Sequence, residues 1–219
     1  MNAIIWVVMG LAGGFLGFLI PGITNKIIIY KCGGVKTFPI YDRRSCSLYV
    51  KALLCISNSA VWAFAGMRTD NHFAAFLIPI LFSAAIIVAI IDVRIRVIPN
   101  ELVLAMVVTG VAYQVLNSGL SSLLTSALCM VGMMLLFAAA GIFGSFNMIG
   151  AGDVKLAGAM GLALGYPGIL TSLAIMSAAL FIYCFAGLAI KKLNLRSTFA
   201  FAPFMMSGMV VSMARILVI

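Results

Sequence analysis

The sequence predicts an all-α polytopic membrane protein, a bundle of about eight transmembrane helices with both termini outside. Hydrophobic residues make up 64% of the 219 residues, and charged residues make up only 9%. A soluble domain needs more polar surface than this, and the long apolar runs match the thickness of a bilayer. The runs are continuous and do not alternate, which argues against a transmembrane β-barrel.

The predicted spans are separated by short segments rich in glycine, proline and charge. The first span ends at Pro21, and residues 21–47 form the longest polar stretch. The third span runs into Asp92. The sixth is short for a full crossing and ends at a turn, Tyr166–Gly168. Spans are expected at about residues 3–20, 48–66, 73–91, 101–116, 123–143, 154–165, 169–190 and 199–217.

The basic residues set the predicted orientation. If the loop 21–47 faces the cytoplasm, 12 of the 14 basic residues lie in cytoplasmic loops or at their edges. The net charge of +9 is therefore interpreted as topology and as contact with anionic membrane lipids, and no nucleic-acid partner is expected. We expect an N-terminal region, residues 1–72, that carries this short basic loop, and a six-span core at residues 73–219. Residues 3–20 lack a preceding basic region, which predicts a retained span.

Two acidic residues stand out in this topology. Asp92 and Asp153 are 61 positions apart, and each lies at the cytoplasmic end of a predicted span. Spans four and five form an out-and-back hairpin between them, so both side chains are expected at the same membrane depth. A carboxylate at this position is costly unless it is paired, hydrated or used in function. Helix packing could therefore bring the two carboxyl groups together.

Two adjacent carboxyl groups suit one kind of chemistry. When they share a proton, one can activate water as a base while the other polarises a peptide carbonyl. Like-charge repulsion and a low dielectric push the pKa values of such a pair apart. The only histidine, His72, is predicted on the opposite side, and the five cysteines form no CxxC pair. Serine or cysteine nucleophiles near the acids therefore lack a base, and a metal site lacks ligands.

Simpler structural roles are open for the same residues. Asp153 could cap a helix, where aspartate is favoured by hydrogen bonding and by the helix dipole. Asp92 could pair with a neighbouring arginine, and Pro99-Asn100 could start the fourth span. Lys155 could be an anchor in a cytoplasmic loop. In a different functional class, buried carboxylates could serve a proton-coupled transporter, although no carboxylate lies at the membrane midplane.

The segment Gly150-Ala151-Gly152-Asp153-Val154-Lys155-Leu156 resembles the GxGDxKL motif of type IV prepilin peptidases, which are GxGD-type membrane aspartyl proteases. Asp92, followed by six residues and then Pro99-Asn100, resembles the other aspartate motif of that family. The resemblance covers roughly the whole chain. It implies that Asp92 and Asp153 are the catalytic pair of a hydrolase in the bacterial cytoplasmic (inner) membrane. Lower-ranked candidates for substrate binding are Gly150, Gly152, Pro99, Asn100 and Lys155.

The resemblance also implies the substrate, a type IV prepilin whose short basic leader is cut off just before its hydrophobic helix. Arg43-Arg44-Ser45-Cys46 is similar to a stretch that precedes zinc-binding CxxC pairs in many members, but the pairs are absent here, so no metal is expected. The peptidase needs no cofactor. A bifunctional peptidase and N-methyltransferase, which would use S-adenosylmethionine, is the nearest alternative. A non-catalytic component of a pilus or secretion machine is another.

Overall fold

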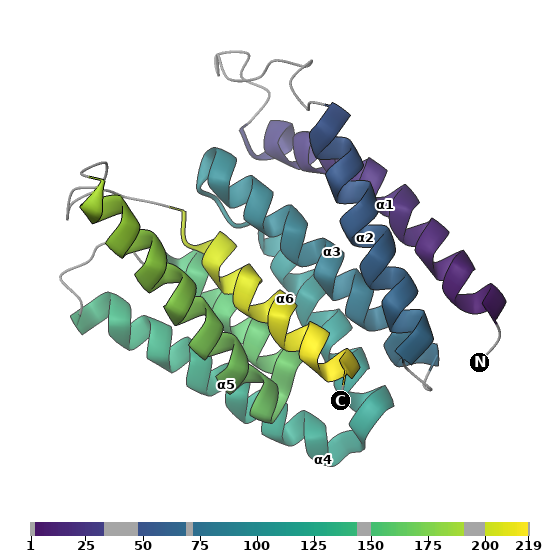
Figure 1. Ribbon diagram of the computed structural model, residues 1–219. Helices are drawn as coiled ribbons and strands as arrows, with labels where there is room; N and C mark the ends of the chain where they lie inside the picture. Colours follow the sequence, from purple (N-terminus) through teal and green to yellow (C-terminus); the bar gives the residue numbers. More distant parts are fainter. Residues whose placement is uncertain (1–2, 33–47, 69–71, 144–149, 191–199, 219) are drawn as a thin grey trace. The chain divides into compact units, whose positions relative to one another are not determined.

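The computed structural model describes residues 3–32, 48–68, 72–143, 150–190 and 200–218 (Figure 1). This part of the chain is folded into α-helices and contains no strand. The prediction of an all-α fold is thereby confirmed. The helices are α1 (Ala3–Lys31), α2 (Leu48–Arg68), α3 (His72–Ile95), α4 (Asn100–Phe143), α5 (Ala151–Ala189) and α6 (Ala202–Val218).

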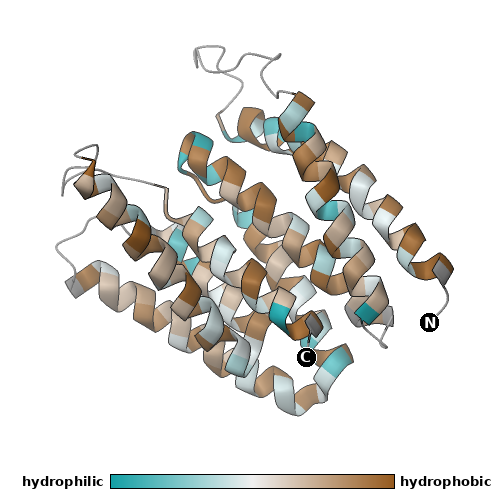
Figure 2. Cartoon of the chain, viewed as in Figure 1, coloured by the Kyte–Doolittle hydropathy of each residue, from teal (hydrophilic) through white to brown (hydrophobic). Residues whose placement is uncertain are grey.

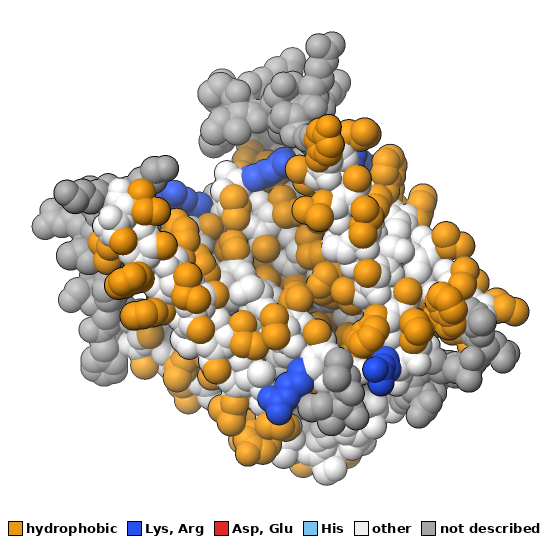
Figure 3. Space-filling model, in the orientation of Figure 1, with side chains coloured by type: hydrophobic (Ala, Val, Ile, Leu, Met, Phe, Trp, Pro, Cys, Tyr) orange, Lys and Arg blue, Asp and Glu red, His pale blue; other side chains and the backbone are white. Residues whose placement is uncertain are grey.

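The helices have the composition of a membrane protein. Five described segments are long and apolar enough to cross a bilayer, and α6 is a shorter apolar helix. Hydrophobic residues run along the helices in Figure 2, and their side chains are spread over the face shown in Figure 3, where few Lys and Arg side chains are seen. Large apolar side chains such as Phe15, Leu128 and Phe185 are 65%, 73% and 68% exposed. A lipid surround accounts for such exposure. The count of eight spans and the location of the termini stay predictions.

The prediction that the first span ends at Pro21 is wrong. Helix α1 continues through Pro21 to Lys31, so part of the expected loop 21–47 is helical. Proline lacks a backbone donor, but membrane helices accept it because neighbouring groups satisfy the freed backbone. Just after the proline, the hydroxyl of Thr24 bonds back to the carbonyl of Ile20 at 2.7 Å, so this buried polar side chain is satisfied within its own helix. Arg43–Cys46 lies outside the described residues.

Helix α4 reverses direction within its length. Gly119 has φ 81° and ψ −175°, which a helix cannot contain. The hydroxyl of Ser122 donates to Oε1 of Gln114 at 2.8 Å. Eight residues of straight helix span about 12 Å, too far for these two side chains, so the chain must fold back between them. The break lies in the turn that the sequence predicts between spans four and five.

Helix α5 is broken in the same way, at Gly165, which has φ 58°. Because Pro167 has no backbone N–H, the carbonyl of Ala163 would lack its partner in a continuous helix. Nε2 of Gln114 donates to this carbonyl at 3.1 Å and to that of Leu162 at 3.3 Å. A side chain of α4 thus satisfies the break in α5, as a bilayer interior requires.

The chain divides into two compact units, Met1–Ile87 and Val88–Ile219. The predicted division into residues 1–72 and 73–219 is a functional one and stays a prediction. In the first unit α1 packs on α2, where a Cβ at Gly13 would lie only 2.5 Å from the Trp62 ring. In the second unit α4 and α6 both pack against α5. The last two turns of α3 belong to this second unit and bring Asp92 to it.

Candidate active site

Asp92 lies in the last turn of α3 and is buried, with 5% of its surface exposed. Its Oδ2 accepts a hydrogen bond of 2.9 Å from the backbone N–H of Ala202, the first residue of α6. The backbone amide of Phe201 is a second donor to the same carboxyl group. A buried carboxylate is stable only when such donors replace water. The buried position of Asp92 therefore depends on a contact 110 residues away in sequence.

The start of α6 is built to supply these donors. The carbonyl of Phe201 accepts the first helical bonds, from Phe204 at 3.1 Å and Met205 at 3.4 Å. Pro203 stands in the first turn, where its missing N–H costs nothing. The amides of Phe201 and Ala202 precede the first helical bond and have no acceptor within α6. The carboxylate of Asp92 fills that role, and the positive end of the helix dipole favours its charge.

Asp153 is the third residue of α5, and the helix begins three residues earlier than the predicted span. Gly150, not Asp153, is the N-cap, and its N–H donates to Oδ2 of Asp153 at 3.0 Å. The Asp153 side chain is half-buried. The charge of Asp92 acts on Asp153, so the two carboxyl groups lie close enough to interact electrostatically. The second unit therefore brings together the two acids that the sequence singles out.

The segment between α3 and α4 closes against α5 beside this pair. Arg96 directly follows α3 and has φ 53°, a left-handed conformation that turns the chain away from the helix axis, and its charge acts on Asp92. A Cβ on Gly152 would lie 3.2 Å from Cβ of Ile98, so glycine lets this segment approach α5 closely. Gly150 differs, because a Cβ there would meet only atoms of its own turn. Gly152 thus packs inside the protein, whereas Gly150 faces outward and is exposed.

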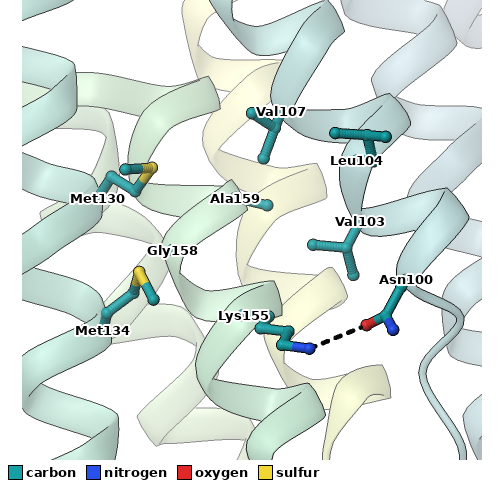
Figure 4. Close-up of a pocket in the computed structure, with 9 residues that line it drawn as sticks. All are labelled: Asn100, Val103, Leu104, Val107, Met130, Met134, Lys155, Gly158 and Ala159. Atoms are coloured by element: carbon teal, nitrogen blue, oxygen red, sulfur yellow. Dashed lines mark hydrogen bonds between the residues drawn. The ribbon is translucent and has the colours of Figure 1, made fainter.

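Asn100, the first residue of α4, and Lys155 of α5 lie next to each other. Lys155 Nζ donates to Oδ1 of Asn100 at 3.2 Å, and both side chains are exposed (Figure 4). Two residues turn a helix by about 200°, so Lys155 points away from Asp153. The carbonyl of Pro99 accepts the amides of Leu102 and Val103, both at 3.2 Å, and so starts α4. Of the five residues considered for substrate binding, Gly150 hydrogen-bonds to Asp153 and Gly152 directly precedes it in the chain.

An apolar cavity of about 400 Å³ adjoins Lys155 and Asn100. Figure 4 shows Gly158 and Ala159 of α5 between side chains from the two halves of α4. The cavity therefore opens on the side of α5 opposite Asp153. Its other lining residues are Val103, Leu104, Val107, Met130 and Met134.

The sequence gives no sign of Phe201 and Ala202, because they act through backbone amides that every residue except proline carries. The sequence predicts a helix start near residue 199, but it does not predict that the amides at this helix start bind Asp92. Within the described ranges, no three or more His, Cys, Asp or Glu side chains are grouped to hold a metal ion. The expectation that the peptidase needs no metal stays a prediction.

The helices and this site define a helical membrane protein with two interacting carboxyl groups at helix ends. A family model for type IV leader peptidases matches residues 79–191, which is more than half of the chain. The chain belongs to the type IV leader peptidase family and is a peptidase. The match includes both aspartates and ends before α6. No curated protein and no solved structure gave a significant match.

Proposed function

We propose that this chain is an aspartyl endopeptidase that removes the short basic leader from type IV prepilins. It would act at the cytoplasmic face of the bacterial inner membrane, as a multi-pass protein. The observation that carries the proposal is that Asp92 and Asp153 lie close enough for the charge of Asp92 to act on Asp153, in a member of the leader peptidase family. Both acids lie at helix ends, and Asp153 is partly exposed, so a substrate backbone would approach the pair from the side of Asp153.

The reaction follows from this pair. Like-charge repulsion favours a state in which the two carboxyl groups hold one proton between them. The ionised group takes a proton from water, whose oxygen attacks the scissile carbonyl, and the protonated group donates to the carbonyl oxygen. No metal is required. S-adenosylmethionine is needed only if the chain also methylates the new N-terminus.

The surroundings of the pair suit an extended substrate. The outward face of Gly150 carries no side chain, so a peptide backbone can pass close to Asp153. Gly152 supports this opening indirectly, because its contact with Ile98 holds the α3–α4 segment against α5. The hydrophobic helix of the prepilin would remain among lipids and apolar helices, where close packing favours it. Lys155 and Asn100 would contact the substrate only at a site away from Asp92 and Asp153.

The test is cleavage of a co-expressed prepilin by wild type, Asp92→Asn and Asp153→Asn. Asparagine keeps an acceptor oxygen for the amides of Ala202 and Gly150, so the fold is retained while acid–base chemistry is lost. We expect each variant to lose on the order of 10³-fold in rate. Pilin mass reports cleavage, and a methyl group on the mature N-terminus would reveal the bifunctional alternative.

Glu101→Gln is the matched control. This acid lies in the first turn of α4, in the same unit as the dyad, and its variant should cleave like wild type. All variants must reach wild-type levels in the membrane fraction. Full cleavage by either aspartate variant would overturn the aspartyl mechanism and favour the transporter or the non-catalytic assembly component.

A further inference from the structure

The two acids of the proposed dyad are held differently. Asp92 receives two backbone amides from another helix, those of Phe201 and Ala202, and the charge of Arg96 acts on it. Asp153 receives one amide, that of Gly150 in its own helix turn. Donors to a carboxylate favour its ionised form. Burial disfavours the charged form of both groups, and Asp92 is the less exposed of the two, so the amides of Phe201 and Ala202 and the charge of Arg96 are what oppose this cost at Asp92.

We propose that the first turn of α6 is a positioning element that holds Asp92 in its ionised form, making Asp92 the general base and Asp153 the proton donor. This inference rests on the proposed function and deepens it, because it assigns a separate role to each acid. Phe201 and Ala202 act through Asp92 and do not touch the substrate. Among the residues that the structure describes, the groups that act on Asp92 are these two amides at the start of α6, Arg96 just after α3, and Asp153 of α5.

The assigned roles give a balanced reaction. Asp92 takes a proton from water as the water oxygen bonds to the peptide carbon, and Asp153 gives its proton to the carbonyl oxygen. The tetrahedral intermediate then expels the amine, which receives the proton from Asp92 as the C–N bond breaks. Asp153 recovers its proton from the hydroxyl group as the new carboxyl forms. No oxidant, reductant or metal enters these steps.

The test removes one amide without changing a side chain. Replacing Ala202 with its α-hydroxy analogue turns the Phe201–Ala202 amide into an ester, which has no N–H to donate to Asp92. The matched control is the same replacement at Phe204, whose N–H bonds to the Phe201 carbonyl at 3.1 Å within α6. Each ester loses one hydrogen bond in the same helix turn, but only the first loses a bond to Asp92.

Full-length protein in vesicles would be assayed for cleavage of a full-length prepilin across pH. Losing a donor to the charged form raises the proton affinity of Asp92, so a higher pH is needed to ionise it. We expect the ester at 202 to move the acid limb of the kcat/KM profile up by about one pH unit and to lower kcat about tenfold, with KM unchanged. The ester at 204 should leave the acid limb in place.

Ala202→Pro removes the same N–H by ordinary mutagenesis, since the first helical position accepts proline. It should shift the acid limb in the same direction if the ester protein is produced poorly. An unchanged profile at position 202, or an equal loss in the 202 and 204 esters, would overturn the positioning role. Absence of cleavage by wild type, or cleavage by Asp92→Asn, would instead overturn the proposed function.

Discussion

The two units use polar groups in different ways. In the first unit, buried polar side chains are neutral and join helices to one another: Ser83 Oγ lies 3.0 Å from Oδ1 of Asn58 and accepts from Nε1 of Trp62 at 3.4 Å. In the second unit, carboxylates lie at helix ends. The acidic residues of the described part of the chain, Asp92, Glu101 and Asp153, all belong to this unit.

A membrane enzyme has two requirements: its helices must stay packed together, and its charged groups must be stabilised. Neutral hydrogen bonds and small residues hold helices together in lipid, where there is little hydrophobic drive for their association. Charges are tolerated only where donors or water reach them, which confines chemistry to helix ends and breaks. The first unit shows neutral hydrogen bonds between helices, whereas the second shows such bonds and also carboxylates at helix ends. Substitutions that affect only packing or only charge test this separation.

The largest effect on stability is expected from Gly161→Ala in the second unit. A Cβ at this position would lie 2.6 Å from the backbone carbonyl oxygen of Cys129, and backbone cannot move aside cheaply. Overpacking of this kind costs about 3 kcal/mol of unfolding free energy. Thermal unfolding in detergent would measure it. Gly132→Ala is the control, because a Cβ there meets nothing within 4 Å, and equal stability of the two variants would contradict the tight α4–α5 contact.

A smaller loss is expected from Gly13→Ala in the first unit. The added methyl would meet the side chain of Trp62, which can shift in part, so we expect a cost of about 1–2 kcal/mol. Gly22→Ala serves as the control, with open space around its Cβ. The separation of the units predicts that prepilin cleavage per folded molecule is unchanged in Gly13→Ala. A tenfold loss of kcat in the folded variant would break the comparison.

The smallest effect is expected from Lys155→Met. The substitution removes the hydrogen bond to Asn100 and the charge at the mouth of the apolar cavity. Lys155 is exposed and points away from Asp153, so kcat should stay within about twofold of wild type. Any contribution to substrate binding would appear in KM. Steady-state kinetics with a full-length prepilin separates the two constants, and a large fall in kcat would place Lys155 at the dyad.

The meeting of the two acids could be predicted because it follows from topology. Apolar runs and basic loops place Asp92 and Asp153 at one membrane depth, and the hairpin between them sets their proximity. The turns near Gly119 and Gly165 could be predicted from local composition in the same way. The length of helix α1 was harder to predict, because a proline such as Pro21 usually ends a helix in water but is accepted inside a helix in lipid.

The partner of Asp92 could not be predicted from the sequence. Almost every residue has a backbone amide, so the identities of Phe201 and Ala202 do not reveal that their amides bind Asp92. The approach of these amides to Asp92 depends on how α6 packs against α5. The position of Asp153 within its helix was also missed, by three residues, because glycine can serve as an N-cap without a side-chain signal. Patterns of side chains locate reactive groups, whereas backbone donors emerge only from tertiary packing.

The pairing of Gln114 with Ser122 also bears on how the chain is assembled during synthesis. A hairpin whose polar side chains satisfy each other can enter the bilayer as one piece, before later segments have left the ribosome. Gln114 still has its amide hydrogens to offer, and the carbonyls of Leu162 and Ala163 receive them once α5 arrives. The broken helix α5 can therefore pack against an α4 hairpin that has already formed. The helix that bears Asp153 is then in position before α6 supplies its amides to Asp92.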